Sequence, residues 1–373
     1  MKRHECLQAV AKAAGDTLTI VTVGGTATEW HAYRPSEGNF RCRTLGLVSS
    51  ISLGLALVRP QRKVLALDGD GALLMNLCSL PTMAWRNPPN LIHVVFDNGV
   101  YEASASLPTA TVGGADLVAL ARDTGYPHAV WAPTVEAFRQ EFQAAMDRKA
   151  LSFIGARVEP GLTTLPQWIL PERENKYRFR RYVQQTEPPE PARPTRVAAE
   201  KGGAQDTPGV AAAREILAAL QEAEIDLVAS VPDEKLGDLL WLLHRQTDLI
   251  HVPLCREEEG IGVCAGAHLG GKRAAIFMQN AGFLNSCNGL TTTALQFSIP
   301  MLLLIYYAGD IGDRGFATVG SVTEPVLQAM GIRYYILRER EQIRWTIKGA
   351  QVLAEESERP VAVLLTKDVL AKR

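Results

Sequence analysis

Two glycine-flanked turns carry oxygen-bearing side chains at the ends of neighbouring apolar runs. The run KVLAL leads into Gly69-Asp70-Gly71, and the run NLIHVVF leads into Asp97-Asn98-Gly99. Backbone N–H groups at such a turn, and at the start of the helix expected from about Met75, bind phosphate oxygens, and glycine lets the backbone come close. A carboxylate beside a phosphate requires a shared cation. The first turn therefore predicts a phosphate site with a divalent metal.

Asp70 and Asn98 are the candidate ligands of that metal. They lie 28 positions apart (98 minus 70), a distance that one strand, turn, helix and strand cover before the chain returns to the same sheet edge. Mg²⁺ prefers hard oxygen ligands in an octahedron that it shares with phosphates. Asp70 and Asn98 can each offer an oxygen, and the main-chain carbonyl of Val100 can offer a third. The spacing predicts that two separate turns converge on one metal and its diphosphate.

Two other interpretations of these turns need no metal. Glycine and Asn-Gly pairs are common in tight turns that bind nothing. A dinucleotide-binding oxidoreductase would use Asp97 as its ribose ligand, but its fingerprint needs a third glycine. Three places after Gly71 stands Leu74, which disfavours the dinucleotide interpretation.

The composition is that of a soluble globular protein with about two domains. The chain has 373 residues, of which 47% are hydrophobic and 21% charged. Its 39 basic and 40 acidic residues give a net charge of −1, so charge does not favour a nucleic-acid partner. The apolar runs are too short to span a bilayer, and the amino-terminal segment has helical amphipathicity, which is not typical of a signal peptide. Six cysteines lack a C-x-x-C pair, and we expect a cytoplasmic protein.

Two similar alternations of strands and helices flank a proline-rich segment. The expected strands are TLTIVTVGG, KVLALDGDG, NLIHVVFDNG, HAVWA and LSFIGARVEPG, then EIDLVASVP, LIHVPL, RAAIFMQN, IPMLLLIYY, RYYIL and RPVAVLLT. Mostly apolar strands are typical of parallel sheets covered on both faces. Residues 161–207 are rich in proline and charge, which predicts a linker. We expect an α/β fold in which two doubly wound parallel-sheet domains, residues 1–160 and 208–373, bind ligands at the carboxyl ends of their strands.

Both halves of the sequence resemble a known family. Gly-Asp-Gly followed at this distance by Asn is similar to the diphosphate and metal motif of thiamine-diphosphate enzymes. RCRTLGLVSSISLGLALVRPQRKVLALDGDGALLMNLCSLPTMA and DNGVYEASASLPT resemble the pyrophosphate-binding (PP) domain of sulfopyruvate and phosphonopyruvate decarboxylases. LCREEEGIGVCAGAHLGG and IPMLLLIYYAGDIGDRG resemble their pyrimidine-binding (PYR) domain. Phosphonopyruvate decarboxylase has the PYR domain first and sulfopyruvate decarboxylase has separate subunits, so the order here is a reversed fusion.

The resemblance implies thiamine diphosphate and Mg²⁺ as cofactors and gives each candidate a role. Asp70, Asn98 and the Val100 carbonyl would hold Mg²⁺. Leu45 would bend the cofactor into a V shape unless it is a plain core leucine, and Gln279 would line the cofactor or substrate pocket. The residues expected at the cofactor's diphosphate are Gly24, Gly25, Thr26, Gly69, Gly71 and Ala72.

The family's essential glutamate lies near a helix start in the PYR domain. The stretch REEEG offers Glu257, Glu258 and Glu259, which point about 100° apart on a helix, so one of them can face the cofactor. Gapless alignment of the following AGAHLGG with the family favours Glu257, and Glu259 is the alternative. Acidic residues also stabilise a helix N-terminus without any catalytic role.

The implied reaction is the decarboxylation of a small 2-oxo acid to an aldehyde. There are two alternatives: a carboligase or lyase with the same cofactor, and a non-catalytic subunit that binds the cofactor. His31, Tyr101 and Glu102 are candidates for proton handling, His31 for its ordinary pKa. Glu102 would repel a sulfonate or phosphonate unless Arg314 or a linker arginine compensates it.

Family cofactors lie between domains that commonly come from different subunits, so we expect a homodimer or homotetramer without nucleic-acid or membrane partners.

Overall fold

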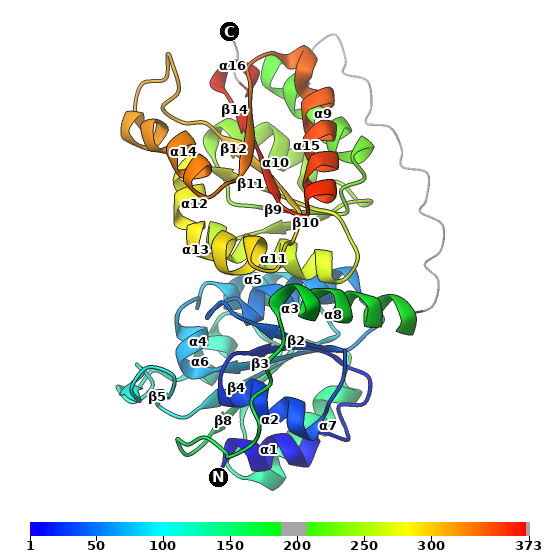
Figure 1. Ribbon diagram of the computed structural model, residues 1–373, viewed down its shortest axis with the longest axis vertical. Helices are drawn as coiled ribbons and strands as arrows, with labels where there is room; N and C mark the ends of the chain where they lie inside the picture. Colours follow the sequence, from blue (N-terminus) through cyan, green and yellow to red (C-terminus); the bar gives the residue numbers. More distant parts are fainter. Residues whose placement is uncertain (188–206, 371–373) are drawn as a thin grey trace. The chain divides into compact units, whose positions relative to one another are not determined.

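The computed structural model describes residues 1–187 and 207–370. These residues form two compact units, one mainly from residues 1–186 and the other mainly from residues 207–370 (Figure 1). Each unit contains a six-stranded parallel sheet with helices around it. The expected α/β fold with two parallel-sheet units is therefore confirmed.

The sheet of the first unit has the strand order β2-β1-β3-β4-β8-β7. Its strands are β1 (Leu18–Thr22), β2 (Asn39–Cys42), β3 (Val64–Gly69), β4 (Leu91–Asp97), β7 (His128–Trp131) and β8 (Ser152–Arg157). A short antiparallel hairpin follows β4 and consists of β5 (Val100–Tyr101) and β6 (Leu107–Pro108). Strands β1 and β4 are buried throughout, as expected for a sheet that is covered on both faces.

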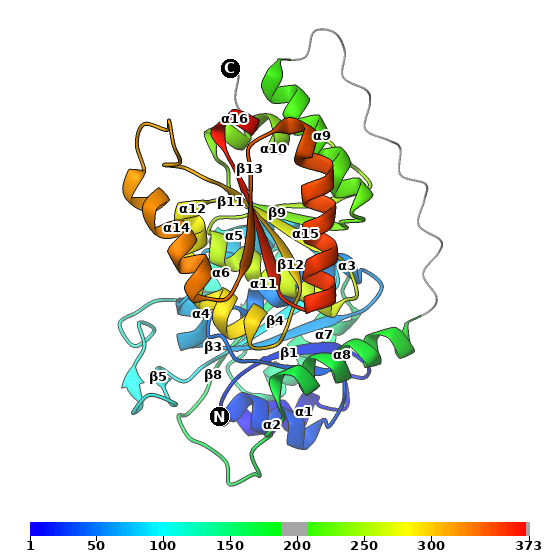
Figure 2. The same cartoon turned by 45° about the horizontal axis from the view of Figure 1, so that its top comes forward.

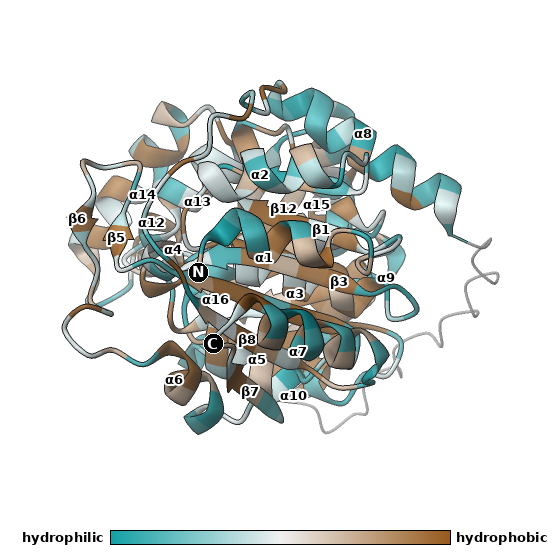
Figure 3. Ribbon diagram, turned by 90° about the horizontal axis from the view of Figure 1, so that it is seen from below, coloured by the Kyte–Doolittle hydropathy of each residue, from teal (hydrophilic) through white to brown (hydrophobic). Residues whose placement is uncertain are grey.

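The helices of the first unit form its outer layers. They are α1 (Arg3–Val10), α2 (Gly25–Tyr33), α3 (Val48–Val58), α4 (Asp70–Leu74), α5 (Ser79–Arg86), α6 (Leu117–Asp123), α7 (Val135–Asp147) and α8 (Glu172–Thr186). A hydrophobic core joins α1, α2 and α7 to one face of the sheet. In Figure 3 the sheet strands are largely brown, whereas α7 and α8 are mostly teal. The helix expected from Met75 begins instead at Asp70, directly at the end of β3.

The sheet of the second unit has the order β10-β9-β11-β12-β14-β13. Its strands are β9 (Leu227–Ser230), β10 (Ile250–Pro253), β11 (Ala274–Gln279), β12 (Met301–Tyr306), β13 (Arg333–Leu337) and β14 (Pro360–Leu365). Its helical segments are α9 (Pro208–Glu222), η1 (Glu234–Leu236), α10 (Gly237–His244), α11 (Glu257–Leu269), α12 (Asn280–Asn285), α13 (Cys287–Gly289), η2 (Leu290–Leu295), α14 (Ala317–Ala329), η3 (Arg340–Gln342), α15 (Ile343–Ser357) and α16 (Lys367–Leu370). Figure 2 shows α14 and α15 on opposite faces of this sheet.

The two sheets have the same topology. If the sheet strands of each unit are numbered from the first, both orders are 2-1-3-4-6-5. The order reverses between β1 and β3 in the first unit and between β9 and β11 in the second. Ligands of such sheets bind beside this reversal, at the carboxyl ends of the strands. The turns after β1 and β3 therefore lie at the expected ligand-binding edge.

The prediction of a linker over residues 161–207 is wrong for part of that segment. Glu172–Thr186 form helix α8, which packs against β2. The Phe179 ring is fully buried and lies edge-on to Phe40, with 5.8 Å between ring centroids. The first unit therefore extends past the boundary expected at residue 160. Residues 188–206 of the predicted linker lie outside the described residues.

Across the parts of the chain that the structure describes, we find no helix with the length and hydrophobicity that a bilayer crossing requires.

Candidate active site

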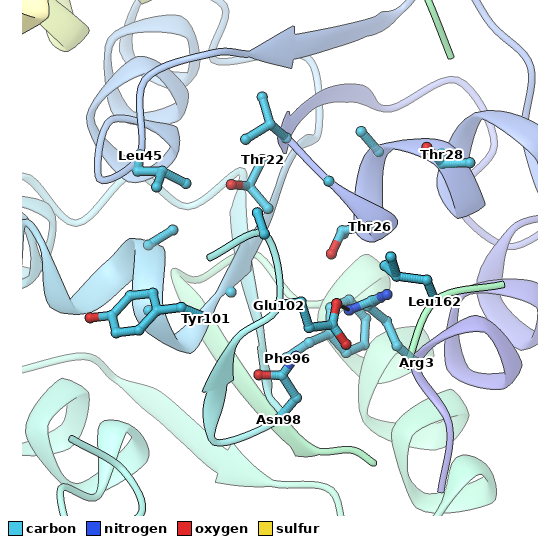
Figure 4. A pocket seen from close by; sticks show the side chains of 18 of the residues that line it. Arg3, Thr22, Thr26, Thr28, Leu45, Phe96, Asn98, Tyr101, Glu102 and Leu162 are labelled. Atoms are coloured by element: carbon cyan, nitrogen blue, oxygen red, sulfur yellow. Dashed lines mark hydrogen bonds and ion pairs between the residues drawn. The ribbon is translucent and has the colours of Figure 1, made fainter. Parts of the chain in front are cut away.

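A cavity of about 440 Å³ lies at the carboxyl end of the first unit's sheet. Its walls come from the turns after β1, β3 and β4, from the loop after β2 and from residues 162–168. Figure 4 shows side chains from these separate segments around one space. The predicted site residues that line the cavity are Gly24, Gly25, Thr26, Leu45, Gly69, Asp70, Gly71, Ala72, Asn98, Val100 and Tyr101.

The glycine turns leave room at this cavity. Gly24 has a φ of +93°, which favours glycine, and it precedes the first turn of α2. A Cβ on Gly71 would lie 2.4 Å from Cε1 of Tyr101, so the tyrosine ring packs directly on this glycine. Helices α2 and α4 both begin at the cavity, and the first N–H groups of a helix lack partners within the helix. These backbone groups can bind the oxygens of a phosphate.

Two buried carboxylates stand beside these turns. Asp70 is 3% exposed and Asp97 is 8% exposed. Thr109 Oγ1 donates a hydrogen bond of 2.6 Å to Asp70 Oδ2, and Thr111 Oγ1 donates one of 2.8 Å to Asp97 Oδ1. Burial raises the pKa of Asp70, and the neighbouring Asp97 raises it as well, against the lowering effect of the Thr109 hydrogen bond. Two acidic groups held this close favour a bound cation.

The protein oxygens at the cavity are suitable ligands for Mg²⁺. Asp70, Asn98 and Val100 all line the cavity. Asn98 Oδ1 accepts a hydrogen bond of 3.0 Å from the Val100 N–H, which holds the Asn98 side chain against the backbone of the hairpin. Within residues 1–187 and 207–370 no group of three His, Cys, Asp or Glu side chains could hold a metal alone. A donor set of few protein oxygens fits Mg²⁺, which keeps waters and phosphate oxygens as further ligands.

Glu102 shares with Glu29 the charge of an arginine that the sequence did not indicate. Arg3 Nη1 donates to Glu102 Oε2 at 2.9 Å, and Arg3 Nε donates to Glu29 Oε2 at 2.9 Å. The second oxygen of Glu102 accepts the Gly161 N–H at 2.7 Å. Figure 4 shows Arg3 and Glu102 pointing toward one another. The cation beside Glu102 is thus Arg3, which also pairs with Glu29, where the sequence suggested Arg314 or a linker arginine.

Two further arginines give the cavity a positive wall. Arg41 donates from Nη1 to the Trp168 carbonyl at 2.5 Å and from Nη2 to the Leu170 carbonyl at 3.0 Å. Its buried Nε has no hydrogen-bond partner among the described residues, and burial lowers the pKa of this guanidinium. Arg43 pairs with Glu172 at 3.3 Å and is 43% exposed. Because Arg41 binds neutral carbonyls, its charge is available to an anion in the cavity.

The other predicted residues of the first unit lie as follows. Leu45 is 39% exposed at the cavity, so it is not a core leucine. Tyr101 is partly buried at the same cavity. His31 does not line this cavity: its ring stacks on Trp168, with 4.5 Å between centroids, and it lines a second, smaller cavity. The structure therefore brings Tyr101, but not His31, to the glycine turns.

The three glutamates at the start of α11 have different surroundings. Glu259 is 1% exposed, and its Oε1 accepts the N–H groups of Cys255 and Arg256 at 2.5 and 3.0 Å. Glu258 Oε1 accepts the Gly289 N–H at 3.0 Å. Glu259 thus caps its own helix in the manner of a capping box.

Glu257 lies against the start of α12. A Cβ on Gly282 would be 2.3 Å from Glu257 Cγ, and Asn285 Nδ2 donates to Glu257 Oε2 at 3.5 Å. Helix α12 follows Gln279, the last residue of β11, whose Nε2 donates to Asp233 Oδ2 at 2.8 Å. Glu257 and Gln279 thus lie near the carboxyl end of one strand of the second sheet. Glu257 is partly exposed, which leaves its carboxylate more accessible than that of Glu259.

Known proteins are similar to this chain in sequence and in fold. Residues 25–156 match the family model of the thiamine pyrophosphate enzyme C-terminal TPP-binding domain. Sulfopyruvate decarboxylase subunit alpha of Methanococcus maripaludis is 36% identical over 156 residues, which are 41% of this chain and 93% of that protein. Sulfopyruvate decarboxylase subunit beta of Methanocaldococcus jannaschii is 33% identical over 180 residues, which are 48% and 95%. Phosphonopyruvate decarboxylase of Streptomyces viridochromogenes is 29% identical over 182 residues, which are 48% and 45%.

Solved structures share the fold at low sequence identity. Benzoylformate decarboxylase from Polynucleobacter necessarius has a TM-score of 0.57 at 12% identity and covers 98% of both chains. Transketolase from Campylobacter jejuni has a TM-score of 0.63 at 12% identity over 98% of this chain and 71% of the other. The fold and the sequence matches together define the class of thiamine-diphosphate-dependent enzymes. Within that class, this chain belongs to the family of sulfopyruvate and phosphonopyruvate decarboxylases.

Proposed function

We propose that this protein decarboxylates a small 2-oxo acid, without oxidation, to an aldehyde, with thiamine diphosphate and Mg²⁺. The observation that carries the proposal is one cavity in which Asp70, Asn98 and Val100 meet two glycine turns, on a chain of this family. Bound thiamine diphosphate would supply a cationic ring that accepts the electrons left when CO₂ departs. The residues of the chain bind and orient the reacting groups and exclude water.

Each residue at the cavity has a defined task in this proposal. Asp70 and Asn98 hold Mg²⁺ through their side-chain oxygens, and Val100 does so through its carbonyl. The residues whose backbone faces the diphosphate are Gly24, Gly25, Thr26, Gly69, Gly71 and Ala72. Leu45 has a partly exposed apolar side chain on the cavity wall, which would pack against bound thiamine diphosphate. Tyr101, whose ring covers Gly71, borders the substrate and offers a hydroxyl proton.

Glu257 is the proton-handling carboxylate of the second unit. It would exchange a proton with the pyrimidine part of bound thiamine diphosphate, and Gln279, the last residue of β11, would line the cofactor or substrate site. The cap that Glu259 forms with the backbone of Cys255 and Arg256 supports the choice of Glu257. A carboxylate that already accepts two backbone N–H groups has less capacity for a ligand.

The charges of the cavity favour a substrate with a second anionic group, such as a sulfonate or phosphonate. Glu102, the acidic side chain that would oppose such a group, is paired with Arg3 at 2.9 Å. Arg41 and Arg43 add positive charge to the wall of the cavity. Guanidinium groups match the geometry of such oxyanions through paired hydrogen bonds.

We further propose that the active protein is a homodimer or homotetramer with its active sites at subunit interfaces. Two relatives from one organism are named as the alpha and the beta subunit of sulfopyruvate decarboxylase, which supports a site assembled from two kinds of domain. Light scattering of the purified chain, with and without cofactor, measures the assembly. A monomer that turns over substrate at full rate would contradict this proposal.

The test is turnover of purified protein with thiamine diphosphate and Mg²⁺. Sulfopyruvate, phosphonopyruvate and pyruvate are supplied separately, and CO₂ and aldehyde are measured. We expect CO₂ with an equal amount of aldehyde, and faster turnover of the two dianionic acids than of pyruvate. A product with a new carbon–carbon bond would identify a carboligase instead. Failure to bind the cofactor would overturn the proposal.

Substrate recognition is tested with Arg43→Met and Arg41→Met. Each should raise KM for sulfopyruvate by about tenfold, the usual cost of a lost charge-assisted hydrogen bond, and leave KM for pyruvate nearly unchanged. An equal rise for both acids would assign these arginines to the cofactor. No rise for either would remove them from the site.

A further inference from the structure

A carboxylate and an imidazole lie together inside the sheet of the first unit, just before the turn that follows β3. Asp68 and His93 are both 0% exposed and lie on the neighbouring parallel strands β3 and β4. Oδ2 of Asp68 is 3.7 Å from Nε2 of His93, an ion-pair distance for a protonated imidazole. Neither residue is among those that line the active-site cavity. The function proposed above therefore gives this pair no role.

The surroundings of the pair are otherwise apolar. Oδ2 of Asp68 and both ring nitrogens of His93 have no hydrogen-bond partner in the described structure. The His93 ring lies edge-on to Phe153, with 5.0 Å between centroids, and the strand neighbours Leu67 and Val94 are buried. An ion pair in such surroundings can often be replaced by apolar side chains without loss of stability. Stability alone therefore does not explain why these two residues occupy the sheet.

The other oxygen of Asp68 holds the end of the strand. Oδ1 of Asp68 accepts a hydrogen bond of 2.9 Å from the Gly69 N–H. Strand β1 is in register with β3 as far as Val21 opposite Leu67, and β1 ends at Thr22. Gly69 therefore has no register partner in β1. The Asp68 carboxylate supplies an acceptor for its N–H at this end of the strand.

The conformation of Gly69 sets the direction in which α4 begins. Gly69 is the N-cap residue of α4, with φ −116° and ψ 158°, and Asp70 is the first residue of that helix. A glycine has more backbone freedom than any other residue, so a hydrogen bond to its N–H restricts a position that would otherwise rotate easily. Rotation there would move both the Asp70 carboxylate and the first N–H groups of α4.

We propose that Asp68 and His93 are positioning residues of the cofactor site. Asp68 fixes the Gly69 peptide through Oδ1, and His93 fixes the orientation of the Asp68 carboxylate through Oδ2. Neither side chain touches the cofactor, and both act through the backbone that leads into Asp70. This inference rests on the function proposed above, because it assigns the pair to the binding of thiamine diphosphate and Mg²⁺.

The experiment is a calorimetric titration of the full chain with thiamine diphosphate in the presence of Mg²⁺, with urea unfolding as the measure of stability. The double variant Asp68→Leu with His93→Leu removes both partners together, so no charge stays buried alone and the stability should remain close to that of the native chain. Its Kd for thiamine diphosphate should nevertheless rise about tenfold or more, the usual effect of losing a group that orients a metal ligand.

Two further variants separate the hydrogen bond from the charge. Asp68→Asn keeps an Oδ1 that accepts the Gly69 N–H, and its Nδ2 can donate to a neutral His93 ring, so the Kd should stay close to the native value. Asp68→Val removes the acceptor but leaves His93 in place, and it should raise the Kd as the double variant does. It therefore provides the same test if the double variant does not fold.

The possible failures are distinguishable. If the native chain does not bind thiamine diphosphate, the proposed function fails and this inference fails with it. If the native chain binds and the double variant, or Asp68→Val in its place, binds with the same Kd, the assignment of this pair alone is overturned. A loss of binding that merely follows the loss of folded protein shows a structural role and overturns it as well.

Discussion

The Thr109 hydroxyl donates a hydrogen bond of 2.6 Å to Oδ2 of Asp70. Thr109 follows strand β6, and its N–H donates to the Gly99 carbonyl at 2.8 Å, so it closes the base of the β5–β6 hairpin. Asp70 lines the cavity and begins α4. The contact links the orientation of the proposed metal ligand to the hairpin that carries Val100 and Tyr101, and Thr111 Oγ1 adds a longer hydrogen bond of 3.4 Å to the same oxygen.

Replacing Thr109 by valine should weaken Mg²⁺ binding. The side-chain shape is nearly kept, but the donor that orients the Asp70 carboxylate is lost, and such outer contacts cost about tenfold in metal affinity. Titration of cofactor binding with Mg²⁺ measures the effect. Thr109→Ser keeps the hydroxyl and is the matched control, for which we expect affinity close to that of the native protein. Equal affinity in the valine variant would mean that Asp70 is oriented without Thr109.

Substitutions at Glu257 and at Glu259 should have different effects: the first should lower the turnover rate and the second should lower the stability. Glu257→Gln should lower kcat by at least about a hundredfold, in line with the loss of a proton-transferring group, and it should leave the unfolding temperature unchanged, since this side chain is partly exposed. Rate measurements at saturating substrate and a thermal melt test both expectations.

Glu259→Ala should show the opposite pattern. Its carboxylate caps α11 through two backbone N–H groups, and loss of a cap costs about 1 to 2 kcal/mol in the free energy of unfolding. Glu259→Gln keeps an acceptor oxygen and should lose less stability. If Glu259→Gln abolishes turnover while Glu257→Gln does not, Glu259 is the catalytic glutamate.

The parallel sheets could be predicted because local composition determines them. The buried strands β1, β3 and β4 are runs of apolar residues that end in glycine or Asp-Asn-Gly turns, and both features are visible without the fold. The meeting of Asp70 with Asn98 at one cavity followed from the spacing of two such strands. Strand β2 was missed since it is four residues long and contains Arg41, which interrupts its apolar pattern.

Contacts between distant residues could not be predicted in this way. Arg3 and Glu102 are 99 positions apart, and no period or motif relates α1 to the loop between β5 and β6. Helix α8 was missed because its buried stripe is narrow and includes Asn175 and Lys176, residue types that composition assigns to solvent. The spacing from Phe179 to Val183 was the available signal, since side chains four apart share one helix face.

Arg3 should be a major contributor to the stability of the first unit. Arg3 is 5% exposed, and its guanidinium donates to two carboxylates, those of Glu102 and of Glu29, which is 1% exposed. Arg3→Met leaves the Glu29 carboxylate buried without its cation, which costs about 3 to 5 kcal/mol in the free energy of unfolding. Urea unfolding monitored by fluorescence measures the loss.

The double variant Arg3→Met with Glu29→Leu tests the reason for that loss. Replacing Arg3 and Glu29 by apolar groups removes the buried unpaired carboxylate of Glu29. Glu102, which is 14% exposed and still accepts the Gly161 N–H, remains without its cation, so part of the stability should return. A double variant as unstable as Arg3→Met alone would show that packing of the long arginine side chain, and not charge compensation, holds α1 against α2.

Alanine variants of Leu45 and Leu47 test whether the Leu45 side chain on the cavity wall contacts the cofactor, with Leu47 as the control. Leu45 is 39% exposed at the cavity, whereas Leu47, two residues later, is 2% exposed in the core. Leu45→Ala removes few packing contacts, so the free energy of unfolding should change by about 0.5 kcal/mol or less, while the affinity for thiamine diphosphate and the turnover rate should both fall. Leu47→Ala creates a cavity and should cost about 2 to 4 kcal/mol, with the affinity for the cofactor kept in the fraction that remains folded. Thermal melts and cofactor titrations of the two variants separate the effects. If Leu45→Ala binds and turns over like the native protein, this side chain does not press on the cofactor and the shape of the bound cofactor must be set by other residues of the cavity.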